Sequence, residues 1–103
     1  MEEIGMSIKC TQRVCLTGLV KGRVQGVFFR AEAQAKAEQL GVAGWVRNTM
    51  DGDVEVLLQG PAESLSKMEE WLRIGPPRAS VVAVELSECP EGTEQLAGFE
   101  IRR

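Results

Sequence analysis

Histidine and tyrosine are absent from this chain, and only 5% of its residues are aromatic. Without histidine there is no imidazole base, so Ser–His and Cys–His nucleophile pairs are excluded. The three cysteines, Cys10, Cys15 and Cys89, do not have the spacing of metal ligands. We therefore expect no metal and no cofactor, and any chemistry must depend on other side chains and on the backbone.

Long apolar runs are missing as well, so we expect no segment that crosses a membrane. Residues Met1 to Gly5 are acidic and lack the basic start and apolar block of a secretory signal, which predicts a cytoplasmic protein. The net charge of −3 argues against nucleic acids and membrane surfaces as partners. An RNA-binding sheet is further disfavoured, because such sheets use paired aromatic side chains.

Apolar periodicity and turn signals predict a single domain over residues 13–103, preceded by a flexible lead-in over residues 1–12. Strands are expected at 13–21, 42–48, 53–58, 80–89 and 99–101, and helices at 28–40 and from Pro61 to Gly75. The order βαββαβ with a short final strand predicts an α+β, ferredoxin-like split βαβ fold. In this fold two helices cover one face of an antiparallel sheet.

A glycine-containing segment joins the first expected strand to the first expected helix, with the sequence Gly22-Arg23-Val24-Gln25-Gly26-Val27-Phe28-Phe29-Arg30. Backbone N–H groups that converge ahead of a helix N-terminus are suited to hold an anion. A cation in the first helical turn, where Arg30 falls, opposes the helix dipole unless an anion binds there. The segment therefore predicts a site for a small anionic ligand.

The expected topology brings a second polar residue to the same place. The first strand runs toward the glycine segment, the first helix returns, and the second strand runs back again to end at Asn48. Asn48 should therefore lie at the same edge of the sheet as Arg30. We expect Phe29 to pack in the core and Phe28 to lie at the rim of this site.

Two further blocks, Gly44-Trp45-Val46-Arg47-Asn48-Thr49 and Asp51-Gly52-Asp53-Val54-Glu55, follow in register with the glycine segment. Together the blocks closely resemble the acylphosphatase family, over about residues 13–102. The resemblance implies metal-free hydrolysis of the carboxyl–phosphate bond of acyl phosphates, with inorganic phosphate as a product. It implies Arg30 as the phosphate-binding residue and Asn48 as the residue that orients the attacking water. The phosphate cradle that it implies is the backbone of Gly22, Arg23, Val24, Gln25, Gly26 and Val27.

Other interpretations remain open. Arg30 could pair with Glu32 or Glu55 as an ordinary surface residue, and Asn48 could serve only the turn. Thr49 is a candidate supporting residue, or it simply opens the turn. The chain as a whole could be a non-catalytic phosphate-binding module of the same fold, or an accessory domain of a larger maturation enzyme. The length of the chain and the lack of zinc-finger cysteines disfavour the last alternative, and we expect a monomer.

The cysteines leave one pairing question. Cys15 and Cys89 fall on strands that are antiparallel neighbours in this fold, at the edge opposite the expected site. A disulfide is geometrically allowed if their Cα atoms lie within about 7 Å, and Cys10 is a competing partner. Because cytosolic thiols are usually reduced, we expect free thiols.

Overall fold

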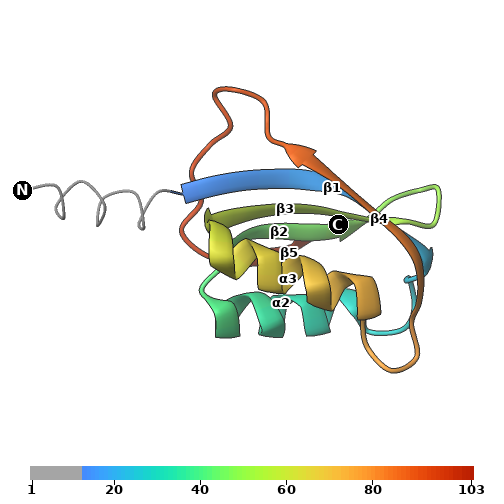
Figure 1. Cartoon of the computed structure of the whole chain (residues 1–103). Helices are drawn as coiled ribbons and strands as arrows, with labels where there is room; N and C mark the ends of the chain where they lie inside the picture. Colours follow the sequence, from blue (N-terminus) through green and yellow to red (C-terminus); the bar gives the residue numbers. More distant parts are fainter. Residues whose placement is uncertain (1–12) are drawn as a thin grey trace, which may run out of the picture.

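The structure is a computed structural model that describes residues 13–103, so the expected lead-in over 1–12, with Cys10, lies outside the described residues. Its elements follow the expected βαββαβ order with a final strand: β1 (Arg13–Arg23), α2 (Phe29–Leu40), β2 (Ala43–Asn48), β3 (Val54–Pro61), α3 (Ala62–Ile74), β4 (Ser80–Glu88) and β5 (Phe99–Arg102). The expected ferredoxin-like architecture is confirmed, with both helices on one face of the sheet (Figure 1).

The sheet has the strand order β4-β1-β3-β2-β5 and is mixed, which corrects the expectation of an antiparallel sheet. The pairs β1–β3, β1–β4 and β2–β3 are antiparallel, but β5 lies parallel to β2, with Phe99 opposite Gly44. The guanidinium of Arg102 lies 5.2 Å from the ring centroid of Trp45 and helps to hold this edge strand. The last strand thus brings residues around 101 next to the end of β2.

The first strand is longer than expected, because Gly22 and Arg23 belong to β1 and pair with β4. The register shifts between Lys21 and Gly22, which marks a β-bulge. Gly22 has φ 126°, and a Cβ built there would come within 2.2 Å of the carbonyl oxygen of Ser80. Glycine is therefore required at this point by the close approach of two backbones.

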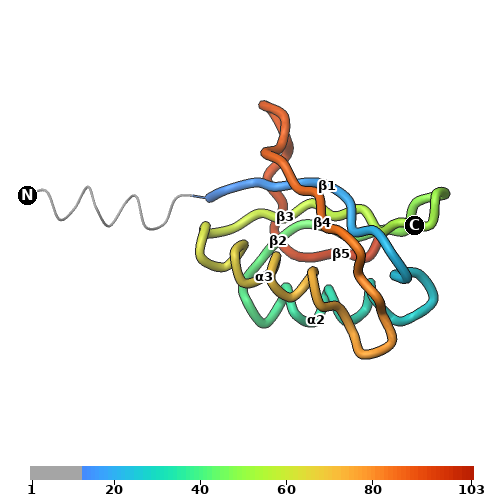
Figure 2. The backbone as a smooth tube through the Cα atoms, turned by 45° about the vertical axis from the view of Figure 1, so that its right-hand side comes forward, coloured from blue at the N-terminus to red at the C-terminus, as the bar shows by residue number. Residues whose placement is uncertain are grey.

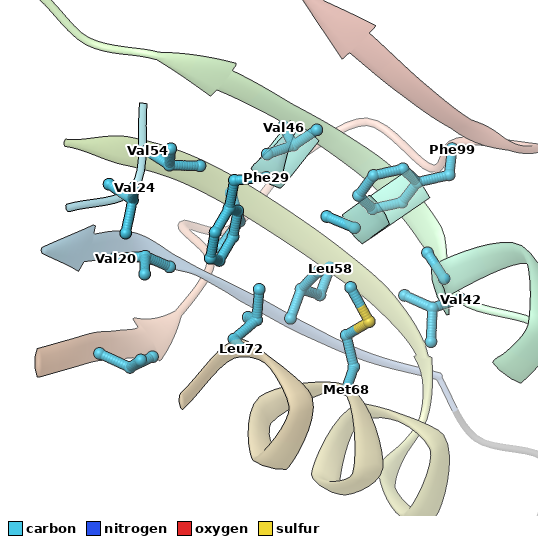
Figure 3. Packing of buried hydrophobic residues seen from close by; sticks show 14 of the residues in the cluster. Val20, Val24, Phe29, Val42, Val46, Val54, Leu58, Met68, Leu72 and Phe99 are labelled. Carbon is cyan, nitrogen blue, oxygen red and sulfur yellow. The ribbon is translucent and has the colours of Figure 1, made fainter. Parts of the chain in front are cut away.

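The core lies between the sheet and the two helices, where Figure 3 shows side chains from both layers interdigitating. Helix α2 buries Phe29, Ala33 and Ala37, and α3 buries Leu65, Met68 and Leu72 on the helical spacing that the sequence predicts. The ring of Phe29 packs on Trp71, with centroids 5.4 Å apart. Phe29 thereby fixes the start of α2, which immediately follows the glycine segment.

A disulfide joins Cys15 and Cys89, whose Cα atoms are 5.4 Å apart, so the expectation of free thiols is wrong for this pair. It links the beginning of β1 to the residue that follows β4. The neighbouring Gln59 is 2% exposed and uses its side-chain amide to hold residues 94 and 96 of the following loop. Neither helix in residues 13–103 has the length and apolar character needed to span a bilayer.

Candidate functional site

The segment between β1 and α2 is anchored by two valines. Val24 and Val27 are 1% and 8% exposed and belong to the core, whereas Gln25 and Gly26 between them lie nearer to solvent. Gly26 has φ 75°, a conformation that favours glycine, and no atom lies within 4 Å of a Cβ built there. The buried valines therefore hold a short surface loop, residues 24–28, in one shape.

The loop ends at Phe28, which is the N-cap of α2 and adopts a left-handed conformation (φ 64°, ψ 23°). The first backbone bond of the helix runs from the N–H of Glu32 to the carbonyl of Phe28, and no side chain caps the helix start. Within residues 13–103, no backbone carbonyl accepts a hydrogen bond from the N–H groups of residues 24–31. The N–H groups of residues 29–31 are the donors that any helix start leaves without an intrahelical acceptor, and they lie at the positive end of the helix dipole.

Arg30 and Asn48 line one pocket together with Gly26, and this pocket has a volume of about 290 Å³. Arg30 is the second residue of α2, and Asn48 is the last residue of β2. In both Figure 1 and Figure 2 the loop after β1 and the β2–β3 turn lie at the same end of the sheet. The topology of the fold thus places a guanidinium and a carboxamide at one cavity, although they are far apart in the sequence.

The guanidinium of Arg30 forms no ion pair with a carboxylate of residues 13–103. Among the ion pairs of residues 13–103, none involves Arg30, and Glu55 pairs instead with Arg47 at 2.7 Å. A long hydrogen bond, 3.4 Å, runs from Nη1 of Arg30 to the carbonyl of Arg102. Within residues 13–103, neither Glu32 nor Glu55, the two partners considered for Arg30, forms an ion pair with it.

Gln25 connects the loop to the β2–β3 turn through its side chain. Its Nε2 donates to the carbonyl oxygens of Thr49 at 2.8 Å and Asp53 at 2.7 Å. The turn is closed by a further bond from the N–H of Asp53 to Oγ1 of Thr49, at 3.1 Å. Thr49 does not line the pocket with Asn48, so its hydroxyl shapes the turn, and Gln25 fixes the residue next to Asn48 relative to the loop.

Asp53 is also held from the end of β1. Nζ of Lys21 donates to its carboxylate at 3.0 Å, and this hydrogen bond, together with the charge of Asp53, raises the pKa of Lys21 above its ordinary value of 10.5. Lys21, Gln25 and Asp53 therefore form a continuous set of contacts from β1 to the turn after Asn48. This set keeps the two halves of the candidate site in register.

Further cations surround the loop. A second hollow is lined by Arg23 and Arg78 with Gln25, Gly26 and Val27, and a third, lined by Arg30 and Asn48, adds Arg103. Among residues 13–103 there is no group of three or more His, Cys, Asp or Glu side chains arranged to hold a metal. Four arginines thus line the hollows beside the loop, which suits a small anion on a chain whose net charge is negative.

Several predicted site residues occupy places other than the expected ones. Gly22 and Arg23 lie in β1 and are paired with β4, so the free part of the expected cradle begins at Val24. Sequence reasoning missed the side chain of Gln25, for which only the backbone was considered, and the contribution of Ile101 to the pocket. A glutamine in a loop has no periodic signal, and Ile101 reaches the pocket only because β5 joins β2.

Comparison with known proteins finds similar sequences and similar solved structures. The family model described as Acylphosphatase matches residues 16–101. An acylphosphatase of Alkalilimnicola ehrlichii is 53% identical over 81% of this chain and 91% of its own length. An acylphosphatase of Pseudomonas paraeruginosa is 48% identical over 88% of this chain and 98% of its own length. The solved structure of an acylphosphatase from Coxiella burnetii has a TM-score of 0.82 and 41% identity, covering 87% of this chain and 93% of that one.

Proposed function

The chain belongs to the acylphosphatase family, which hydrolyses acyl phosphates, and we propose that Arg30 and Asn48 carry this reaction on the loop that precedes α2. The observation that supports the assignment is the pocket that both side chains line together with Gly26. The substrate is an acyl phosphate, and the products are a carboxylate and inorganic phosphate. Acyl transfer through a serine or cysteine nucleophile is not needed for this chemistry.

In the proposed mechanism the phosphoryl group lies in the loop, with Arg30 as its main charged partner. The planar guanidinium can contact two phosphate oxygens at once. The N–H groups of residues 24–31 donate to no backbone carbonyl within residues 13–103. They add fixed dipoles that can face the phosphate oxygens. Because the transition state of phosphoryl transfer is loose and carries charge on the equatorial oxygens, such positioning and electrostatics supply most of the catalysis.

Asn48 orients the attacking water through the donor and the acceptor of its carboxamide. The water oxygen forms a bond to phosphorus while the bond between phosphorus and the acyl oxygen breaks, and the electron pair leaves with the carboxylate. The departing carboxylate has a pKa of about 4, so no general acid is required. A phosphate oxygen of the substrate takes the water proton, which is consistent with a chain that has no histidine.

The proposal is tested by phosphate release from acetyl phosphate and benzoyl phosphate, measured with excess chelator present. Hydrolysis well above the background rate, unchanged by the chelator, is expected. A phosphate monoester with a poorer leaving group serves as the control and should react far more slowly. Phosphate binding without hydrolysis of either acyl phosphate would instead identify a non-catalytic binding module.

We also propose that one chain acts alone, because a single chain supplies the loop, Arg30 and Asn48. Light scattering during gel filtration at assay concentrations checks this, and a dimer as the active species would contradict it. The cytoplasmic location stays a prediction, against which the Cys15–Cys89 disulfide weighs, since disulfides are rare in reducing compartments.

A further inference from the structure

Two exposed apolar side chains stand beside the charged groups of the pocket. Phe28 is 74% exposed and Ile101 is 41% exposed, and both line the cavity that contains Arg30 and Asn48. Ala31 adds a third apolar surface from the first turn of α2. The lining of the cavity therefore combines a cationic and a polar side chain with exposed apolar ones.

The backbone holds Phe28 in a conformation that a bulky residue rarely adopts. Its φ of 64° makes it the one residue other than glycine with positive φ in residues 13–103. Such strain persists where the surrounding structure enforces it, and it is concentrated at functional sites. Here the buried neighbours Val27 and Phe29 fix the chain on either side, so the ring of Phe28 stays at the rim and out of the core.

Ile101 approaches the same rim from a distant part of the chain. It lies on β5, opposite Val46 in the parallel pair with β2, and follows Phe99, which is 6% exposed and anchors the strand. The hydrogen bond from Arg30 to the carbonyl of Arg102 joins the helix to this strand. The two apolar side chains thus come from different elements, the N-cap of α2 and β5, and are held by independent contacts.

We propose that Phe28 and Ile101 form a subsite for the acyl group, and that the preferred substrates are acyl phosphates with an aromatic or branched aliphatic acyl group. The inference rests on the proposed function, because it takes the phosphoryl group to lie against the loop and Arg30. The acyl group then extends from the loop toward Phe28 and Ile101, where burying its carbon surface favours binding. A volume of about 290 Å³ is enough for a phosphate and one ring.

Arg103 suggests a different acyl group, one that carries a negative charge. It lines the adjoining hollow with Arg30, Asn48 and Ile101, where it could attract an acyl group that carries a distal carboxylate. The cavity that contains Phe28 does not include Arg103, and its lining holds no carboxylate and no second cation. We therefore assign the acyl group to Phe28 and Ile101, and succinyl phosphate is the substrate that tests the alternative.

The test compares kcat/KM for benzoyl, acetyl and succinyl phosphate in the wild type and in Phe28→Asn and Ile101→Ser. Asparagine tolerates the left-handed backbone, so Phe28→Asn removes the ring without adding strain. Loss of an aromatic contact should lower the ratio of benzoyl to acetyl kcat/KM by about three- to tenfold. Phe28→Leu should restore part of the ratio, because it restores apolar surface.

Ile74→Ser is the matched control, since Ile74 is 72% exposed and does not line this cavity. This variant should have the same kcat/KM as the wild type for each of the three substrates. Inhibition by inorganic phosphate reports the phosphate half of the site separately. Thermal melting of each variant shows that the fold is retained.

The proposal is overturned if the ratio of benzoyl to acetyl kcat/KM does not change in Phe28→Asn and Ile101→Ser, whether or not the activity itself falls. It is also overturned if succinyl phosphate is the best of the three substrates. If the proposed function itself is wrong, the result differs, because the wild type would then hydrolyse none of the three acyl phosphates. Hydrolysis by the wild type with an unchanged ratio refutes the acyl subsite alone.

Discussion

Gln25 and Thr49 are joined by a hydrogen bond of 2.8 Å, in which the side-chain amide of Gln25 donates to the main-chain carbonyl of Thr49. The same nitrogen donates to Asp53 at 2.7 Å, so one side chain of the loop holds both ends of the β2–β3 turn. Asn48 directly precedes that turn. The position of Asn48, the proposed water-orienting residue, relative to the proposed phosphate loop therefore depends on a residue that need not touch the substrate.

Replacing Gln25 by alanine should lower kcat by about tenfold, because small displacements of a reacting group are costly. The substitution also removes the hydrogen bonds to two carbonyls, which should lower the free energy of unfolding by about 1–2 kcal/mol. Steady-state kinetics and urea unfolding measure the two effects. Gln34→Ala is the matched control, since Gln34 also donates to one carbonyl, that of Phe99 at 3.0 Å, away from the loop. A loss of stability in Gln25→Ala with unchanged kcat would show a purely structural role.

Replacing Asn48 by alanine should reduce kcat by about 100-fold, as expected when one preorganised polar group is removed from a transition state. Binding of inorganic phosphate should change little, because the loop and Arg30 remain. The measurement is kcat for benzoyl phosphate together with the inhibition constant of inorganic phosphate. Near wild-type kcat in Asn48→Ala would contradict the water-orienting role.

Replacing Arg30 by alanine should damage both functions of the site, reducing kcat by about 1000-fold and raising the inhibition constant of phosphate. Arg30→Lys should restore only part of the activity, because an ammonium group is a point charge and cannot make the forked contact. Kinetics of the three proteins with acetyl phosphate give the comparison. If lysine proved as effective as arginine, charge alone would explain the requirement.

Breaking the disulfide should destabilise the fold without slowing the enzyme. Cys15 and Cys89 are separated by 74 positions, and closing a loop of this length is worth about 4 kcal/mol in the chain-entropy model. The bond lies at the end of the sheet away from Asn48, so kcat should be retained. Unfolding with and without reductant, beside a Cys15→Ser variant, measures the effect. Alkylation of thiols in intact cells shows in addition whether the pair is oxidised there, and free thiols would support the cytoplasmic location.

Alkaline pH should weaken the contact between Lys21 and Asp53. The pKa of Lys21 is raised in the folded state above 10.5, so its stabilising effect is complete below pH 10.5 and is lost as the pH rises through the raised value. The difference in unfolding free energy between the wild type and Lys21→Met should therefore shrink as the pH rises above 10.5. Lys36→Met is the control, because Lys36 forms no ion pair with residues 13–103. A difference that stays constant over this range would contradict the assignment.

The order of the elements was predictable because it depends on local patterns, such as the spacing of Phe29, Ala33 and Ala37 on α2. The meeting of Arg30 and Asn48 followed from topology alone. The parallel direction of β5 was not predictable, since four residues with one buried side chain do not encode a partner strand. The end of β1 was placed too early at Lys21, because Gly22 and Arg23 are extended only through pairing with β4.

The parallel alignment of β5 beside β2 has a consequence for how the protein is made. The loop at Gly26 and the strand at Ile101 line the same cavity, and the bond from Arg30 to Arg102 spans 72 positions. A nascent chain therefore carries the loop, with Phe28 uncovered, until residue 101 has been added and can close the cavity. Contacts of such long sequence separation slow folding, so catalytic competence should appear only once β5 has paired with β2.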